Sequence, residues 1–171
     1  AGLRVLSYDL YGRGWSDRPS VAYDTELFDR QLVELLASQN ITRPINLVGY
    51  SMGGAIAINY TARHPGRINR LALIAPAGFP DTDSNLKKFM AMIGFTTNGK
   101  SNPKNQHSAL PDIVERYIEQ ISYKGYGSAL LSTMRNFPMR DMQRQYSDVG
   151  NQILPVAAIW GDDDQVVPYS G

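Results

Sequence analysis

The chain has 171 residues, of which 43% are hydrophobic and 19% charged, proportions that are typical of a globular protein and exclude a disordered one. The formal net charge is only +1 and no basic run is longer than Lys87-Lys88, so the sequence carries no electrostatic footprint for nucleic acid. The lack of cysteine excludes disulfides and thiolate metal sites and favours the cytoplasm, and no apolar run approaches the roughly 20 residues that span a bilayer.

The N-terminal part of the chain predicts one strand followed by one helix. Residues 3–9 (LRVLSYD) have the composition of a strand and end in the glycine-rich turn LYGRGWSDRP. Residues 25–37 carry leucine and phenylalanine at helical spacing, directly after Asp24-Thr25, which can cap a helix.

The next part repeats this alternation. Residues 45–50 (INLVGY) predict a strand, and residues 52–63 predict a helix rich in small residues that stops at His64-Pro65-Gly66. Residues 70–75 (RLALIA) are almost continuously apolar, as in a strand buried on both faces. Strand, helix, strand, helix and strand at this spacing predict a parallel α/β sheet.

The alternation then stops for some seventy residues. Residues 85–95 and 111–137 predict helices, separated by the polar loop TTNGKSNPKNQH, and residues 154–161 (LPVAAIWG) resume the pattern of a buried strand. The simplest interpretation is a helical cap inserted into an α/β core. The expected boundaries are 1–78 and 150–171 for the core and 79–149 for the cap.

The pentapeptide GYSMG places Ser51 between a predicted strand and a predicted helix. A serine on such a strained turn exposes its hydroxyl, as a nucleophile requires. Gly49 and Gly53 are expected there because a side chain would collide with the neighbouring strand or helix, and Gly54 lets the helix approach the sheet. The backbone N–H of Met52, at the start of the helix, can stabilise an oxyanion.

Four segments in this order resemble the α/β-hydrolase superfamily, in particular its capped esterase- and lipase-like members. They are YDLYGRGWSDRP, LVGYSMGG, ARHPGRINRLALIAPAG and LPVAAIWGDDDQVVP. The resemblance implies a partial α/β-hydrolase fold, a mostly parallel sheet with flanking helices and an inserted helical cap. The first segment supplies Asp9, Gly12, Gly14 and Ser16, which are expected to shape a turn and take no part in catalysis.

The resemblance also implies the acidic member of a catalytic triad. In the family pattern this residue is the third after the glycine that follows the strand, which is Asp164 in this chain. Asp162 and Asp163 remain alternatives, because a run of aspartates in a turn also occurs for purely structural reasons. The carboxylate would hold a histidine in the correct tautomer.

Neither histidine of the chain is expected to be the base. His64 follows Ser51 by 13 residues along one helix, or about 20 Å, and His107 lies in the polar cap loop. The resemblance places the catalytic histidine, in chain order, after the acid, and the second oxyanion donor in a loop after an earlier strand. Both are expected to be missing, so the sequence is interpreted as a fragment, and a signal peptide upstream stays open.

The missing strand has a structural consequence. In the family it lies between the strands predicted at 3–9 and 45–50, which must therefore pair directly or leave unpaired edges. The isolated chain is expected to be poorly stable or prone to aggregation.

The function implied for the intact protein is a serine hydrolase acting on carboxylic esters through an acyl-enzyme. The apolar cap favours a small apolar acyl substrate, and Tyr50, Met134 and Phe137 are candidates to contact it. The chemistry requires no cofactor, and no metal site is apparent. The alternatives are C–C bond hydrolysis, perhydrolysis or amide cleavage on the same scaffold, or a non-catalytic binding protein.

Overall fold

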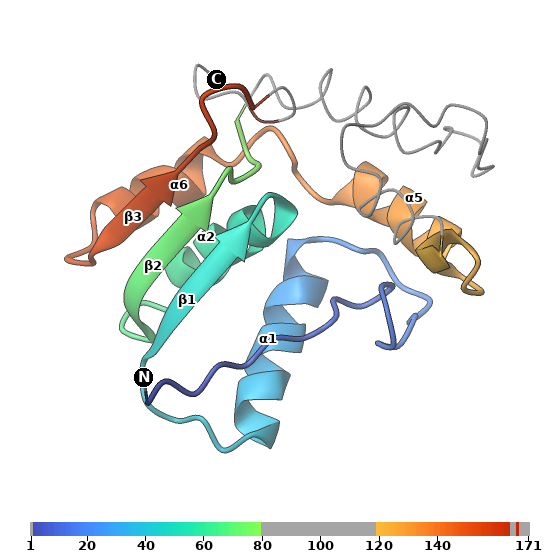
Figure 1. The fold of residues 1–171 in the computed structure, drawn as a ribbon, viewed down its shortest axis with the longest axis horizontal. Helices are drawn as coiled ribbons and strands as arrows, with labels where there is room; N and C mark the ends of the chain where they lie inside the picture. The colour runs from blue at the N-terminus through green and yellow to red at the C-terminus, as the bar shows by residue number, and fades with distance from the viewer. Residues whose placement is uncertain (1, 80–118, 165–166, 168–171) are drawn as a thin grey trace.

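The computed structural model describes residues 2–79, 119–164 and 167, and the predicted helix at 85–95 lies outside this part of the chain. The elements are α1 (Thr25–Ser38), β1 (Ile45–Tyr50), α2 (Met52–Arg63), β2 (Ile68–Ile74), α5 (Tyr126–Asn136), α6 (Gln143–Gly150) and β3 (Val156–Ile159). Figure 1 shows this arrangement.

The described strands form one parallel sheet in the order β1-β2-β3. At its carboxyl end Tyr50 lies opposite Ile74, and Ile74 lies opposite Ile159. The sequence predicted all three strands and the parallel α/β class, and the structure confirms both.

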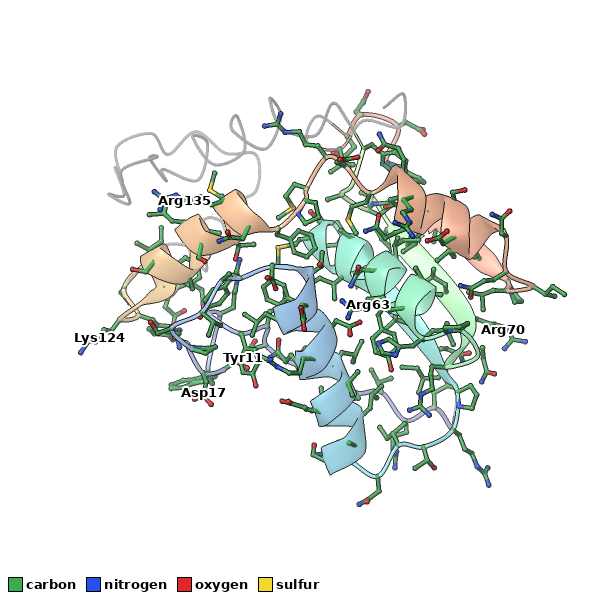
Figure 2. All side chains as sticks on the ribbon, turned by 180° about the vertical axis from the view of Figure 1, so that it is seen from behind. Tyr11, Asp17, Arg63, Arg70, Lys124 and Arg135 are labelled. Atoms are coloured by element: carbon green, nitrogen blue, oxygen red, sulfur yellow. The ribbon has the colours of Figure 1, made fainter. Side chains whose placement is uncertain are left out.

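Helices cover one face of this sheet. Helix α2 packs against β1 and β2, while α1 and α6 pack against α2. Seen from behind, these helices lie in front of the sheet (Figure 2). Leu71 and Leu73 of β2 are 1% and 3% exposed, because their side chains point into this layer.

The opposite face is open within the described part of the chain. Val48 is 63% exposed and Ile159 is 55% exposed. Every residue of β3 is exposed, and β2 is buried only at alternate positions toward its end. The expectation that β2 and β3 are buried on both faces was therefore wrong for this part of the chain, because apolar composition does not reveal what covers a face.

Helix α1 begins where the sequence predicted. The side chain of Asp24 accepts a hydrogen bond from the backbone N–H of Leu27 at 2.9 Å, which satisfies one N–H of the first turn. Leu27, Leu32 and Leu36 form the buried stripe.

The prediction of a strand at residues 3–9 was wrong. The segment forms no strand in the structure, and Leu3 and Val5 are 81% and 83% exposed. A strand is defined by its ladder of hydrogen bonds, and among the described strands β1 is an edge with β2 as its only partner. Of the two expected outcomes, direct pairing and unpaired edges, the structure shows the second.

The helices of the C-terminal half also differ from the prediction. The helix predicted at 111–137 is interrupted at residues 122–125, where Gly125 takes a left-handed φ of 85°, and α5 begins at Tyr126. Helix α6 was not predicted, since its eight residues are largely polar. It packs on α2, and Val149 is 3% exposed.

Candidate active site

Ser51 lies on a strained turn between β1 and α2. Its backbone has φ 52° and ψ −120°, a conformation that costs a non-glycine residue roughly 1–3 kcal/mol. Main-chain hydrogen bonds hold it there. The N–H of Ser51 donates to the carbonyl of Ile74 at 3.0 Å, and its own carbonyl accepts from Ala77 N–H at 3.0 Å. The turn is therefore fixed by β2 and the residues that follow it.

Two glycines allow this turn to pack. A Cβ on Gly49 would lie 2.4 Å from the carbonyl oxygen of Gly53, and a Cβ on Gly54 would lie 2.5 Å from Cβ of Pro76. The collision expected at Gly49 and the close approach expected at Gly54 are both present. The collision expected at Gly53 is not, because nothing lies within 4 Å of a Cβ built there.

The residues after β2 join the three strand ends. Ala75 N–H donates to the carbonyl of Ile159 at 2.9 Å, so the ladder continues one residue beyond the strands. Ala75 has a φ of 40°, which is rare for alanine. Sequence reasoning missed this residue, since an alanine carries no signal of an unusual backbone.

Asp164 lies in the turn after β3. Its backbone N–H donates to the carbonyl of Gly161 at 3.2 Å, and its Oδ1 accepts from the N–H of Val167 at 2.9 Å. It is half-buried, whereas Asp162 and Asp163 are exposed. The three strands are parallel, so the Ser51 and Asp164 turns both follow the carboxyl ends of strands, and these strands, β1 and β3, lie two spacings or roughly 10 Å apart.

The other predicted site residues lie on separate elements. Met52 is the first residue of α2, where N–H groups have no carbonyl partner within the helix. Tyr50 is 69% exposed at the end of β1. Met134 is half-buried on α5, and Phe137 is 4% exposed within the core, with its ring 5.7 Å from that of Phe28.

His64 lies at the opposite end of α2 from Ser51 and is engaged there. Its Nε2 is 3.0 Å from both carboxylate oxygens of Asp29, which is 5% exposed, and its ring lies 4.4 Å from that of Tyr60. The contact ties α2 to α1. His107 lies outside the described residues.

The turn at residues 9–17 has the structural role expected of it. Ser16 Oγ donates to the carbonyl of Asp9 at 2.6 Å, and Asp9 Oδ2 accepts from the N–H of Trp15 at 3.0 Å. Gly14 N–H donates to Gln120 Oε1 at 2.8 Å. Figure 2 shows Asp17, in this turn, at the same end of the molecule as Lys124.

Three aromatic residues, Phe79, Tyr146 and Trp160, form a cluster beside the segments that follow β2 and β3. Sequence reasoning missed this cluster. The ring of Tyr146, on α6, stacks on Phe79 with centroids 4.6 Å apart, and the ring of Phe79 lies 6.5 Å from that of Trp160. Tyr146 Oη donates to the carbonyl of Ala77 at 2.9 Å. Burial raises the pKa of the Tyr146 hydroxyl well above its ordinary value, so the hydroxyl stays a neutral donor.

The described part of the chain shows neither a metal-binding cluster nor a membrane-spanning helix. Within residues 2–79, 119–164 and 167, His, Asp and Glu nowhere form a group of three that could hold a metal ion. None of the helices there has the length and apolar character needed to cross a membrane.

Residues 1–99 match the family model described as alpha/beta hydrolase fold. The chain therefore belongs to the α/β-hydrolase fold family.

Known proteins similar to the chain are named for different activities. It is 35% identical over 80 residues to 1-acylglycerol-3-phosphate O-acyltransferase ABHD5 of Homo sapiens, covering 45% of this chain and 23% of that protein. It is 25% identical to Lipase 1 of Psychrobacter immobilis over 97% of this chain and 56% of the lipase. The crystal structure of a bacterial membrane phospholipase A matches with a TM-score of 0.69 and 25% identity, over 95% of this chain and 55% of the phospholipase. The chain thus spans between about a quarter and just over half of these relatives.

Proposed function

We propose that the protein is a serine hydrolase that cleaves carboxylic esters through an acyl-enzyme. Ser51 Oγ attacks the ester carbonyl carbon while a histidine takes its proton, and the alcohol leaves with that proton when the C–O bond breaks. Water then attacks the acyl-enzyme and releases the acid. Asp164 orients the histidine, and the N–H of Met52 donates to the oxyanion.

The observation that carries this proposal is the backbone of Ser51. A non-glycine residue at φ 52° is strained, and it persists here because hydrogen bonds to Ile74 and Ala77 hold the turn. The turn joins the carboxyl end of a parallel strand to the start of a helix, where N–H groups are available to a developing negative charge. Asp164, half-buried at the same sheet edge, is the third element of the arrangement.

The histidine is proposed to come from a segment of the full-length protein other than these 171 residues. His64 caps the far end of α2, about 20 Å along the helix from Ser51, and is therefore too distant to accept the proton of Ser51. The family likeness to a lipase and to a phospholipase A supports an ester with an apolar acyl group, which the proposed cap would contact through Met134.

Covalent labelling of the full-length protein tests the nucleophile. A fluorophosphonate probe should modify Ser51, and Ser51→Ala should abolish labelling without changing the circular dichroism spectrum. Hydrolysis of p-nitrophenyl esters of increasing chain length, beside a vinylogous diketone for C–C bond cleavage, then identifies the reaction. A wild-type protein that reacts with neither probe nor ester contradicts the proposal.

The neighbouring residues Asp162 and Asp163 provide matched controls for a test of Asp164. Asp164→Asn should lower kcat by about 10³- to 10⁴-fold, as removal of the orienting carboxylate does in serine proteases. Asp162→Asn and Asp163→Asn, in the same turn, should leave kcat within about twofold, since surface substitutions away from the reacting groups have small effects. A large loss in either of these instead reassigns the acid.

A further inference from the structure

We propose that Tyr146, on helix α6, is a positioning residue that fixes the Ser51 turn relative to the end of β3 that leads to Asp164. This inference rests on the proposed function, because it assigns to Tyr146 the task of keeping two groups of one active site in register. Tyr146 is linked to each of them through one neighbour, to the Ser51 turn through Ala77 and to the end of β3 through Phe79.

The hydroxyl reaches the serine turn. Tyr146 Oη donates to the carbonyl of Ala77 at 2.9 Å, and the N–H of Ala77 donates to the carbonyl of Ser51 at 3.0 Å. Two hydrogen bonds in series therefore connect helix α6 to the strained residue. Without the hydrogen bond from Tyr146, the carbonyl of Ala77 would be less firmly held. The hydrogen bond from Ala77 N–H to Ser51 would then be weaker.

The ring of Tyr146 is linked through Phe79 to Trp160, which follows the end of β3. It stacks on Phe79 at a 30° interplanar angle, and Phe79 in turn lies beside Trp160. Trp160 follows β3 directly and precedes Asp164 by four residues. Aromatic contacts of this kind are directional, so they constrain the orientation as well as the separation of the segments that carry them.

The segment between these two contacts needs external support. Ala75 has a φ of 40°, which is rare for alanine, whereas Gly78 has a φ of 123°, a conformation that glycine permits and other residues rarely adopt. Gly78 N–H donates to the carbonyl of Met139 at 3.0 Å, and the carbonyl of Gly78 accepts from Met142 N–H at 3.2 Å. Met139, Met142 and Tyr146 therefore hold Ala77 and Gly78 in place, and Tyr146 is the one of these three that lies on α6.

The test compares Tyr146→Phe and Tyr146→Leu with Tyr60→Phe in the full-length protein. Tyr60 is the matched control, because it is 2% exposed on α2 but its ring contacts His64 at the end of that helix far from Ser51. Tyr146→Phe removes only the hydroxyl and should lower kcat for a p-nitrophenyl ester by about two- to tenfold, with KM within about twofold. Tyr146→Leu also removes the ring and should lower kcat further.

Amide exchange supplies a second readout that does not depend on turnover. In Tyr146→Phe the N–H of Ala77 should exchange faster with solvent, whereas amides in the middle of α2 should keep the wild-type rate. Tyr60→Phe should change neither kcat nor the exchange of Ala77.

The outcomes separate two failures. If the wild type is active and both Tyr146 variants keep its kcat, the positioning role is wrong while the proposed function stands. The same holds if Tyr60→Phe lowers kcat equally, since the effect would then follow from any lost buried hydroxyl. If the wild type itself does not react with ester or fluorophosphonate, the proposed function fails, and the positioning role of Tyr146 fails with it.

Discussion

Replacing Gly49 by alanine tests the packing of the serine turn directly. The added Cβ would lie 2.4 Å from the carbonyl oxygen of Gly53 and 2.7 Å from Cα of Gly54, both of them backbone atoms. These distances are about 1 Å shorter than ordinary carbon contacts, and no rotamer change can relieve them. Overpacking of this kind costs about 1–3 kcal/mol, so we expect Tm of the full-length protein to fall by about 3–10 °C.

The same collision should displace Ser51, because β1 and α2 must separate to admit the methyl group. A displacement of about 1 Å in a reacting group can lower a rate by about 100-fold, so labelling by a fluorophosphonate should slow by up to that factor. Gly53→Ala is the matched control. Nothing lies within 4 Å of a Cβ there, and alanine favours a helix by up to about 1 kcal/mol, so Tm should stay level or rise. Equal losses in the two variants would refute the steric reasoning.

Three further predictions concern stability. A double-mutant cycle of Asp29→Asn and His64→Gln, followed by urea unfolding, should give a coupling of about 1–3 kcal/mol, and a coupling of zero would show that this contact does not join α1 to α2. Burial, with a smaller contribution from Tyr60, raises the pKa of Tyr8 from 10.0 to about 12. Its stabilising effect is complete below pH 10 and is lost between pH 10 and 12, so Tyr8→Phe should flatten the alkaline limb of an unfolding curve, and an unchanged limb would contradict this. Residues 1–171 expressed alone should aggregate, since the described part of the chain leaves one sheet face and the β1 edge exposed. A soluble monomer with a cooperative transition above ordinary mesophile temperatures would overturn that prediction.

The sequence predicted the elements whose signals are local. Asp24 capped α1 as expected, and the strand–serine–helix order of residues 45–63 appeared with the predicted bounds. The segment at 3–9 failed because a strand depends on a neighbour that its own residues do not encode. The break before Tyr126 depends on a left-handed Gly125, a conformation that glycine permits but does not require.

The residues of the candidate site also fall into those that the sequence predicts and those that it does not. Ser51 and Asp164 stand in short motifs whose spacing is visible in the sequence, and the register of β1, β2 and β3 brings their turns to one edge. The supporting residues carry no such signal. Ala75 is strained only because of how β2 ends, and Tyr146 reaches Ala77 across 69 residues of chain. Contacts between segments so far apart in sequence cannot be read from composition or periodicity.

The strained serine and the open sheet face depend on different parts of the sheet. The Ser51 turn is held by β2 and the residues after it, through Ile74 and Ala77, and β2 is the central strand of the three. Exposed apolar residues such as Val48 lie on the opposite face, away from the layer that α2 and α6 fill. Cover on that face would add stability through burial of apolar area, but it would not set the backbone angles of Ser51, which hydrogen bonds along the sheet edge determine. The geometry of the Ser51 turn is therefore set locally by the central strand, whereas the stability of the chain depends on what lies against its open face.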